Sequence, residues 1–177
     1  MSLEIPDPSL VVLVGAAGSG KSTFAARHFA PDEVLSSDAF RALIAGDPSD
    51  QSATRAAFSA LHRTVARRLG QRRLTVVDAT SVQRGARAAL LRTAAAAHVP
   101  AVAIVLDLPP DVVHARNRGR AGGIVPADAV DRQLADLAAT LRPGGIDAEG
   151  FTRVHVLGQA EIDATIVRRS SPNQRGA

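Results

Sequence analysis

The one lysine of this chain lies in the glycine-rich segment GAAGSGKST, residues 15–23, whereas the other twenty of its 21 Lys and Arg side chains are arginines. Gly15, Gly20, Lys21 and Ser22 satisfy the pattern G-x-x-x-x-G-K-[ST], in which backbone N–H groups surround a polyphosphate and the lysine reaches the β- and γ-phosphates. A compact ammonium on a flexible stem suits such an enclosed loop better than a planar guanidinium. The segment therefore predicts a nucleotide-binding site.

The flanking residues place this segment between a strand and a helix. An apolar run, LVVLV at 10–14, precedes it, and KSTFAARHFA at 21–30 has a helical pattern. The glycines allow a tight turn, so the N-terminus of the helix also faces the phosphates. We expect ATP with Mg²⁺, the metal being held by Ser22, and nucleotide contacts from Gly15, Ala16, Ala17, Gly18, Ser19, Gly20, Lys21, Ser22 and Thr23.

The strand-like run LTVVDAT, residues 74–80, limits the class of reaction. Asp78 is followed by Ala79 and not by the glutamate that orients water in many P-loop ATPases, which disfavours a motor ATPase. A guanine-specificity motif of the N-K-x-D type is excluded because it needs a second lysine. A kinase remains, and it requires an acceptor base, a magnesium ligand and mobile cations. Asp78 either supports the Mg²⁺ shell through water or caps the end of its strand.

Asp38 is the candidate base. It follows the predicted strand EVLSS, residues 33–37, and the carboxyl ends of parallel strands form the ligand crevice of α/β folds. Its carboxylate could take the proton of an acceptor hydroxyl. Alternatively, Ser37 or Asp38 is the N-cap of the next helix, which the residues alone favour. Arg41, one helical turn later, would hold the acceptor's phosphate or else be one more solvated arginine.

The segment ARNRGRAGG, residues 115–123, carries candidate mobile cations. Arg116 and Arg120 are four residues apart and share one helix face, and the glycines that follow suit a flap. An arginine lid closes over the phosphates, excludes water and strengthens charge interactions. The alternative is an exposed basic helix end. In company with the glycine-rich loop, the lid is the favoured interpretation.

The elements that must position these residues alternate along the chain between strand-like and helical segments. β-Branched runs alternate with helical stretches, which predicts an α/β fold of the P-loop kinase type, a parallel sheet of about five strands flanked by helices. We expect residues 1–167 to form one domain and the polar segment 168–177 to be a frayed tail. The expected strands are residues 10–14, 33–37, 74–80, 101–108 and 152–157, and the expected helices are residues 21–30, 38–46, 51–70, 83–98, 110–118 and 126–142.

Composition excludes several classes of protein. The 177 residues are 46% hydrophobic, and they include no cysteine and no apolar run long enough to span a membrane. Disulfide frameworks and thiolate metal sites are therefore excluded, and we expect a cytoplasmic location. The net charge of +4 suggests an anionic partner or a compositional bias of the source, while an aromatic content of 3% leaves few platforms for stacking bases.

The chain resembles the kinase module of bacterial polynucleotide kinase-phosphatases over residues 10–157. The resemblance lies in residues 15–62 and in the segments LTVVDAT, VLDLPPDVVHARNRGR and FTRVHVL. It implies transfer of the γ-phosphate of ATP to the 5′-hydroxyl end of DNA or RNA, with Lys21 and Ser22 serving the phosphates and Mg²⁺. Nucleic acid ends are then the expected partner.

The same resemblance implies roles for the other candidates. Asp38 would be the general base at the acceptor hydroxyl, Arg41 would bind the acceptor's 3′-phosphate, and Arg116 and Arg120 would be the lid cations. Ser81 departs from the family, which often has Asn at that position. A kinase of a small metabolite, nucleoside, sugar or antibiotic remains the alternative. A regulatory module that binds ATP without transferring phosphate is a second alternative.

Overall fold

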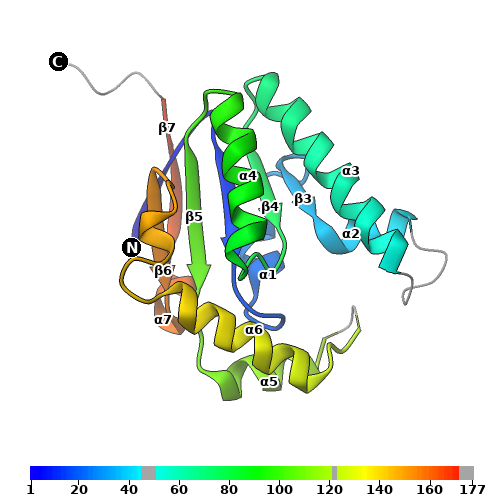
Figure 1. The fold of residues 1–177 in the computed structure, drawn as a ribbon. Helices are drawn as coiled ribbons and strands as arrows, with labels where there is room; N and C mark the ends of the chain where they lie inside the picture. The colour runs from blue at the N-terminus through cyan, green and yellow to red at the C-terminus, as the bar shows by residue number, and fades with distance from the viewer. Residues whose placement is uncertain (45–50, 121–122, 172–177) are drawn as a thin grey trace.

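The structure is a computed structural model that describes residues 1–44, 51–120 and 123–171. Strands and helices alternate along the chain (Figure 1), and five strands form one parallel sheet in the order β3-β4-β2-β5-β6. All five strands expected from the sequence are confirmed, and so is the α/β class. Their bounds are β2 Leu10–Val14, β3 Val34–Ser36, β4 Thr75–Asp78, β5 Ala101–Leu106 and β6 Arg153–Leu157.

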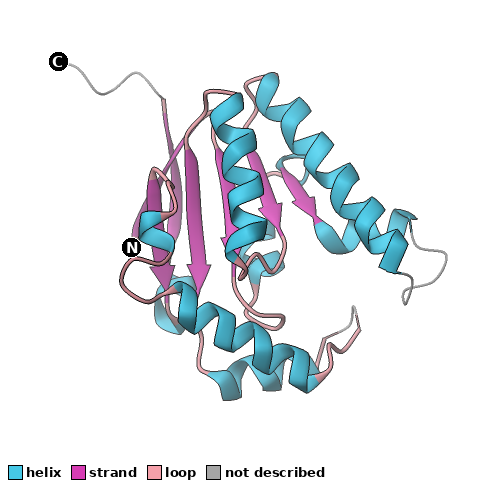
Figure 2. Ribbon diagram, viewed as in Figure 1, coloured by secondary structure: helices cyan, strands magenta, loops and turns pink. Residues whose placement is uncertain are grey.

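Helices cover both faces of this sheet, as Figure 2 shows. α3 and α4 lie on one face, α1 lies on the other, and α5 and α6 lie beyond the carboxyl ends of the strands (Figure 1). The expected helix 38–46 ends outside the described residues, and the helix α7 was not expected. The bounds are α1 Lys21–His28, α2 Ser37–Ile44, α3 Gln51–Gly70, α4 Arg84–Ala96, α5 Pro110–Arg118, α6 Ala127–Thr140 and α7 Gln159–Ala164, with short 3-10 helices at Pro31–Glu33 and Ile146–Ala148.

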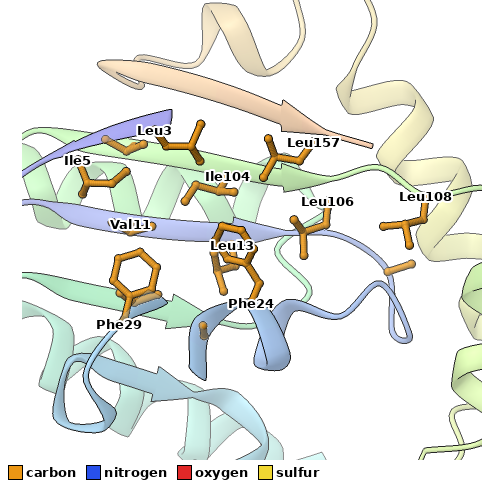
Figure 3. Packing of buried hydrophobic residues seen from close by; sticks show 14 of the residues in the cluster. Leu3, Ile5, Val11, Leu13, Phe24, Phe29, Ile104, Leu106, Leu108 and Leu157 are labelled. Atoms are coloured by element: carbon orange, nitrogen blue, oxygen red, sulfur yellow. The ribbon is translucent and has the colours of Figure 1, made fainter. Parts of the chain in front are cut away.

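β2 is buried at every residue because both faces of the sheet are covered. Val11 and Leu13 pack in a cluster with Phe24 and Phe29 on the α1 face (Figure 3). Val12 packs on the opposite face with buried side chains of α3 and α4. A strand held on both faces gives the glycine-rich loop that follows it a fixed starting point. Among the described residues, no helix combines the length and the apolar character needed to cross a bilayer.

The two ends of the described chain form a second sheet of two strands. β1 (Ser2–Pro6) pairs in parallel with β7 (Ile166–Ser170), with Leu3 opposite Val167. Leu3 and Ile5 are fully buried in the cluster on the α1 face (Figure 3). The prediction of a frayed tail is therefore wrong for residues 168–170, because their backbone pairs with β1. Residues 172–177 of that predicted tail lie outside the described residues.

Candidate active site

The glycine-rich loop joins β2 to α1 at the carboxyl edge of the sheet and borders a cavity of about 670 Å³. Gly18 has a φ of +95°, and an added Cβ would lie 2.5 Å from the backbone oxygen of Val113 in α5, so a larger residue does not fit. Gly15 N donates to Thr80 O at 3.0 Å, which ties the loop to the segment after β4. This is the strand, loop and helix context that the sequence predicts.

Lys21 directs its ammonium group into this loop. Nζ donates to the backbone oxygens of Gly15 and Ala16, at 2.9 Å each. Burial lowers the pKa of Lys21 to about 8, although the Asp78 carboxylate opposes the shift. A phosphate anion beside Nζ compensates for the lost solvation and favours the charged amine. Lys21 is thus placed where a polyphosphate in the loop gains a buried positive charge.

α1 begins without a side-chain cap and without an acidic residue in its first turn. Its first N–H groups are therefore available to an anion, which the partial positive charge of the helix end also attracts. Ser22 Oγ donates to Asp78 Oδ2 at 2.7 Å, and both side chains line the cavity. Hydroxyl and carboxylate oxygens are ligands that suit Mg²⁺, so this pair fits the expected metal.

Asp38 lies in the first turn of α2 and lines the same cavity as the loop. One carboxylate oxygen accepts a hydrogen bond from Arg41, and the other accepts one from Arg120, which follows α5. Ser36 provides the capping contact of α2, because its Oγ accepts from Ala39 N at 3.4 Å. The carboxylate of Asp38 is therefore not used as a helix cap and binds the arginines of the cavity.

The two arginines determine the ionisation of Asp38. Burial raises its pKa, but the charges of Arg41 and Arg120 and their hydrogen bonds outweigh this effect, so the pKa lies below its usual value. Asp38 is therefore a carboxylate, which is the form that accepts a proton. The same two contacts hold that carboxylate in place.

The end of α5 and the segment that follows it border the cavity with two further arginines, Arg116 and Arg120. Arg116 reaches the glycine-rich loop at residues 15–23, the P-loop, because a Cβ added to Gly20 would lie 3.5 Å from Nη1 of Arg116. The buried Asn117 side chain donates to Val125 O at 2.8 Å and accepts from Val125 N at 3.2 Å. This double contact fixes the base of the segment. Residues 121 and 122 of the predicted lid lie outside the described residues.

A second cavity, of about 620 Å³, lies next to the first. The two cavities share Ala79, Thr80 and Gln133, so they meet just beyond the carboxyl end of β4. Apolar side chains of α3, β4 and α4 form much of the second wall, among them Phe58 and Leu90. The arrangement is a polar cavity for a polyphosphate that adjoins a more apolar one.

Comparison with known families agrees with this geometry. The family model AAA_33, described as an AAA domain, matches residues 10–143, which extend from β2 to the end of the α6 region. The chain belongs to this family. The match covers the P-loop, Asp38 and the α5–α6 segment of this AAA domain. No curated protein sequence matches the chain.

Solved structures share the fold of this AAA domain. A chain of the Pnkp1/Rnl/Hen1 RNA repair complex matches with a TM-score of 0.66 and 26% identity, over 77% of this chain and 46% of that one. A sugar kinase from Janibacter sp. HTCC2649 matches with a TM-score of 0.59 and 25% identity, over 85% of both chains. Kti12 from Chaetomium thermophilum, in complex with ADP-AlF3, shows the same fold at 18% identity and a TM-score of 0.65.

The domain therefore has a P-loop kinase fold and a nucleotide site, and this fold is common to relatives with different substrates. The chain spans less than half the length of the repair-complex chain that it matches, 46% of it. The comparisons therefore do not identify an acceptor, and a proposal for it must come from the residues of the site.

No sequence pattern marks Gln133 or Arg87, although both shape this site. Gln133 Oε1 accepts from Ala17 N of the P-loop at 2.8 Å. Arg87 is 1% exposed and donates to the backbone oxygens of Ser81 and Val82, which holds the segment after β4. Both residues lie inside helices whose spacing of apolar residues indicates packing alone, so only their partners in space reveal them.

Proposed function

We propose that this protein is an ATP-dependent kinase that phosphorylates the 5′-hydroxyl end of a DNA or RNA strand. The observation that carries the proposal is that Asp38 shares a cavity with the P-loop Lys21 and is bound by arginines from two elements. An acceptor base, a phosphate-binding lysine and mobile cations are the parts that phosphoryl transfer to a hydroxyl requires.

Each role has a contact that supports it. Lys21 and the first N–H groups of α1 would hold the phosphates, and Ser22 and Asp78 would hold Mg²⁺, which when bound would neutralise phosphate charge. As the oxygen of the acceptor hydroxyl bonds to the γ-phosphorus of ATP, Asp38 accepts the proton of that hydroxyl. The bond from that phosphorus to the β–γ bridging oxygen breaks. The products are ADP and a 5′-phosphorylated strand.

The arginines divide between the two substrates. Arg41 remains beside Asp38 and binds the phosphate on the 3′ side of the terminal nucleoside, where its planar fork suits phosphate oxygens. Arg120 moves from Asp38 to the donor phosphates and joins Arg116 to form the lid. Because Arg120 is one of the two charges that lower the pKa of Asp38, its departure makes the carboxylate a stronger base.

The second cavity supports an acceptor with a flat and partly apolar body. Its wall includes Phe58, Leu61 and Leu90, and it adjoins the donor cavity at Thr80. A nucleobase suits such a wall, whereas a sugar presents hydroxyls on every side and needs polar partners around it. The likeness to a chain of an RNA repair complex supports the same acceptor.

A kinase of a small polyhydroxy compound is the second candidate. It is favoured by the likeness to a sugar kinase, which extends over 85% of both chains, whereas the likeness to the repair-complex chain covers 46% of that protein. The P-loop and Asp38, the proposed general base, suit phosphoryl transfer to either kind of acceptor. The apolar part of the second cavity's lining favours the nucleic acid acceptor over the polyhydroxy compound.

A comparison of acceptors tests the proposal. With ATP and Mg²⁺ in excess, we would measure ADP release as a function of the concentration of a 5′-hydroxyl oligonucleotide and of each of a series of sugars and sugar acids. The proposal predicts the highest kcat/KM for the oligonucleotide, and none for the same oligonucleotide bearing a 5′-phosphate. A higher kcat/KM for any sugar would favour the second candidate.

A further inference from the structure

Gln133 projects from α6 to the P-loop, and its amide has one orientation. Its oxygen, Oε1, lies 2.8 Å from Ala17 N. Because a backbone N–H can only donate, the atom facing it must be the amide oxygen. The amide nitrogen Nε2 therefore points elsewhere, and it has no hydrogen-bond partner among the described residues.

The position of this free donor is distinctive. Three residues line both cavities, namely Ala79, Thr80 and Gln133. Of these three, only Gln133 has a side-chain N–H group, and its two hydrogens are uncommitted. Gln133 also lines the cavity that holds Lys21 and Asp38, the residues proposed to act on the two substrates. A neutral N–H donor in this cavity is available to the charge that develops on a transferring phosphoryl group.

The scaffold around Gln133 holds this donor in position. α6 follows the segment whose base is fixed by the double contact of Asn117 with Val125. Val130 and Leu137, one turn before and one turn after Gln133, are buried in the two opposite hydrophobic clusters. The helix is therefore held on both sides of the residue, so its amide needs little reorganisation to meet a substrate.

We propose that Gln133 is a catalytic residue of this kinase, whose Nε2 donates a hydrogen bond to the phosphoryl group in transfer while Oε1 anchors the P-loop through Ala17. This rests on the proposed function only in that ATP is the donor; it holds for a nucleic acid or a sugar acceptor alike. Loss of one such preorganised donor lowers kcat by roughly 10²- to 10³-fold in enzymes that stabilise a developing oxyanion.

Two substitutions separate donation from anchoring. Gln133→Glu keeps the size of the side chain and an oxygen for Ala17 N, but it removes the N–H donor and adds a negative charge. Gln133→Met has a similar volume and removes both. Gln71→Glu makes the same chemical change at an exposed glutamine after α3 that lines neither cavity, and it serves as the matched control.

Binding and turnover are both measured for each protein. Calorimetry gives the affinities for ADP and for a non-hydrolysable ATP analogue, and thermal unfolding checks the fold. We expect both Gln133 variants to lose about 10²-fold in kcat and to lose more affinity for the analogue than for ADP, with Gln133→Met also losing affinity for ADP because the anchor to Ala17 is gone, whereas Gln71→Glu changes neither. A Gln133→Met protein with an unchanged ratio of the two affinities overturns the proposal, because this variant removes the donor without adding a charge, and so does unchanged kcat.

The calorimetric arm keeps the two proposals distinct. If the unaltered protein phosphorylates no 5′-hydroxyl oligonucleotide, the proposed acceptor is wrong, yet the affinity ratio still reports on Gln133. A selective loss of affinity for the analogue then supports the role of Gln133 in a kinase of another acceptor. Equal losses for ADP and for the analogue in Gln133→Met mean that Gln133 only anchors the loop, which overturns the catalytic role.

Discussion

Asp38 has two functions that compete. As a proposed base it must take a proton, and in this structure its carboxylate is bound by Arg41 and Arg120, which lower its pKa. The side chains of Asp38, Arg41 and Arg120 are partly exposed to solvent. These ion pairs therefore add little to stability, and the arginines can exchange Asp38 for other partners. The arrangement suits a site in which the acceptor and the donor each take one arginine from the carboxylate.

The ionisation of Asp38 can be measured directly. Because the arginines depress its pKa in the folded protein, its contribution to stability is present above the unfolded value of about 3.9 and is lost as the pH falls through the lower folded value. In Arg120→Ala, carbon-13 NMR titration of the Asp38 carboxyl should show a higher pKa. Arg132→Ala is the control, because Arg132 does not contact Asp38. An equal pKa of Asp38 in the unaltered protein, in Arg120→Ala and in Arg132→Ala would contradict these contacts.

Arg41 should affect one substrate only. Arg41→Ala removes the fork that binds the phosphate on the 3′ side of the terminal nucleoside, and it leaves the P-loop intact. We expect a higher KM for a 5′-hydroxyl oligonucleotide, with a smaller change in the KM for ATP. Steady-state kinetics with each substrate varied in turn measures both values. An equal rise in the two would mean that Arg41 is not a contact of the acceptor.

At the scale of elements, a buried ion pair holds the segment after β4. Arg87 and Glu149 are 1% and 4% exposed at their side chains, and Arg87 Nε and Nη2 donate to the two oxygens of Glu149 at 2.7 and 2.5 Å. Arg87 Nη1 also donates to the backbone oxygens of Ser81 and Val82. Thr140 of α6 donates to Val82 O at 2.9 Å as well. The segment bordering both cavities is thus fixed from two helices.

Removal of one partner should be costly and removal of both should not. Arg87→Met leaves Glu149 buried without a partner, which should lower the free energy of unfolding by about 3–5 kcal/mol. The double variant Arg87→Met/Glu149→Leu should recover much of that loss, because no charge remains buried. Urea denaturation measures each value. Arg92→Met, at an exposed arginine of α4, should change it by no more than about 0.5 kcal/mol.

The elements that the sequence predicts are those with a strong periodic signal. β2 and β5 are continuous apolar runs, and α3 to α6 keep helical spacing over many residues, so local pattern and tertiary packing agree. α7 and β7 are each short and largely polar, and their positions depend on partners far along the chain. Such elements have no local signal from which they can be predicted.

The candidate site divides in the same way. Lys21 and Ser22 are predictable because the phosphate loop requires fixed residue types at fixed spacing. Asp38 is found at a strand end, although the residues alone favour a helix cap, a role that Ser36 takes instead. Gln133 and Arg87 act through contacts with residues 116 and 62 positions away, respectively, and a single sequence carries no sign of them.

At the scale of the whole molecule, the ends of the described chain meet. β1 and β7 pair in parallel, and Leu3 and Ile5 complete the cluster on the α1 face of the main sheet (Figure 3). Arg169 extends this junction, because it donates to Glu33 at 2.7 Å. The second sheet therefore covers core that would otherwise face water.

Two neighbouring residues of β7 test this contribution. Val167 packs against the cluster, whereas Ile166 is 59% exposed. Val167→Asp should lower the free energy of unfolding by about 1–3 kcal/mol, because a carboxylate replaces a partly buried apolar group that packs against the core. Ile166→Asp, at the neighbouring exposed position, should have a much smaller effect. Equal effects in thermal or urea unfolding would mean that β7 adds nothing to the core.

The same view of the molecule places donor and acceptor at one edge of the sheet. The P-loop follows β2, Asp38 follows β3 and Asp78 ends β4, so three neighbouring strands deliver Lys21, the proposed base and the proposed metal ligand to one cavity. The proposed kinase activity therefore requires Asp38 and the P-loop to act within this one cavity.

Transfer of labelled γ-phosphate from ATP to a short 5′-hydroxyl oligonucleotide, by the unaltered protein and by Asp38→Asn, tests this claim most directly. The unaltered protein should label the strand and should not label its 5′-phosphorylated counterpart. Asp38→Asn should bind ATP as tightly and transfer almost no label, because the amide cannot accept the proton. Equal labelling by both proteins, or no labelling by the unaltered protein while it binds ATP, would contradict the account.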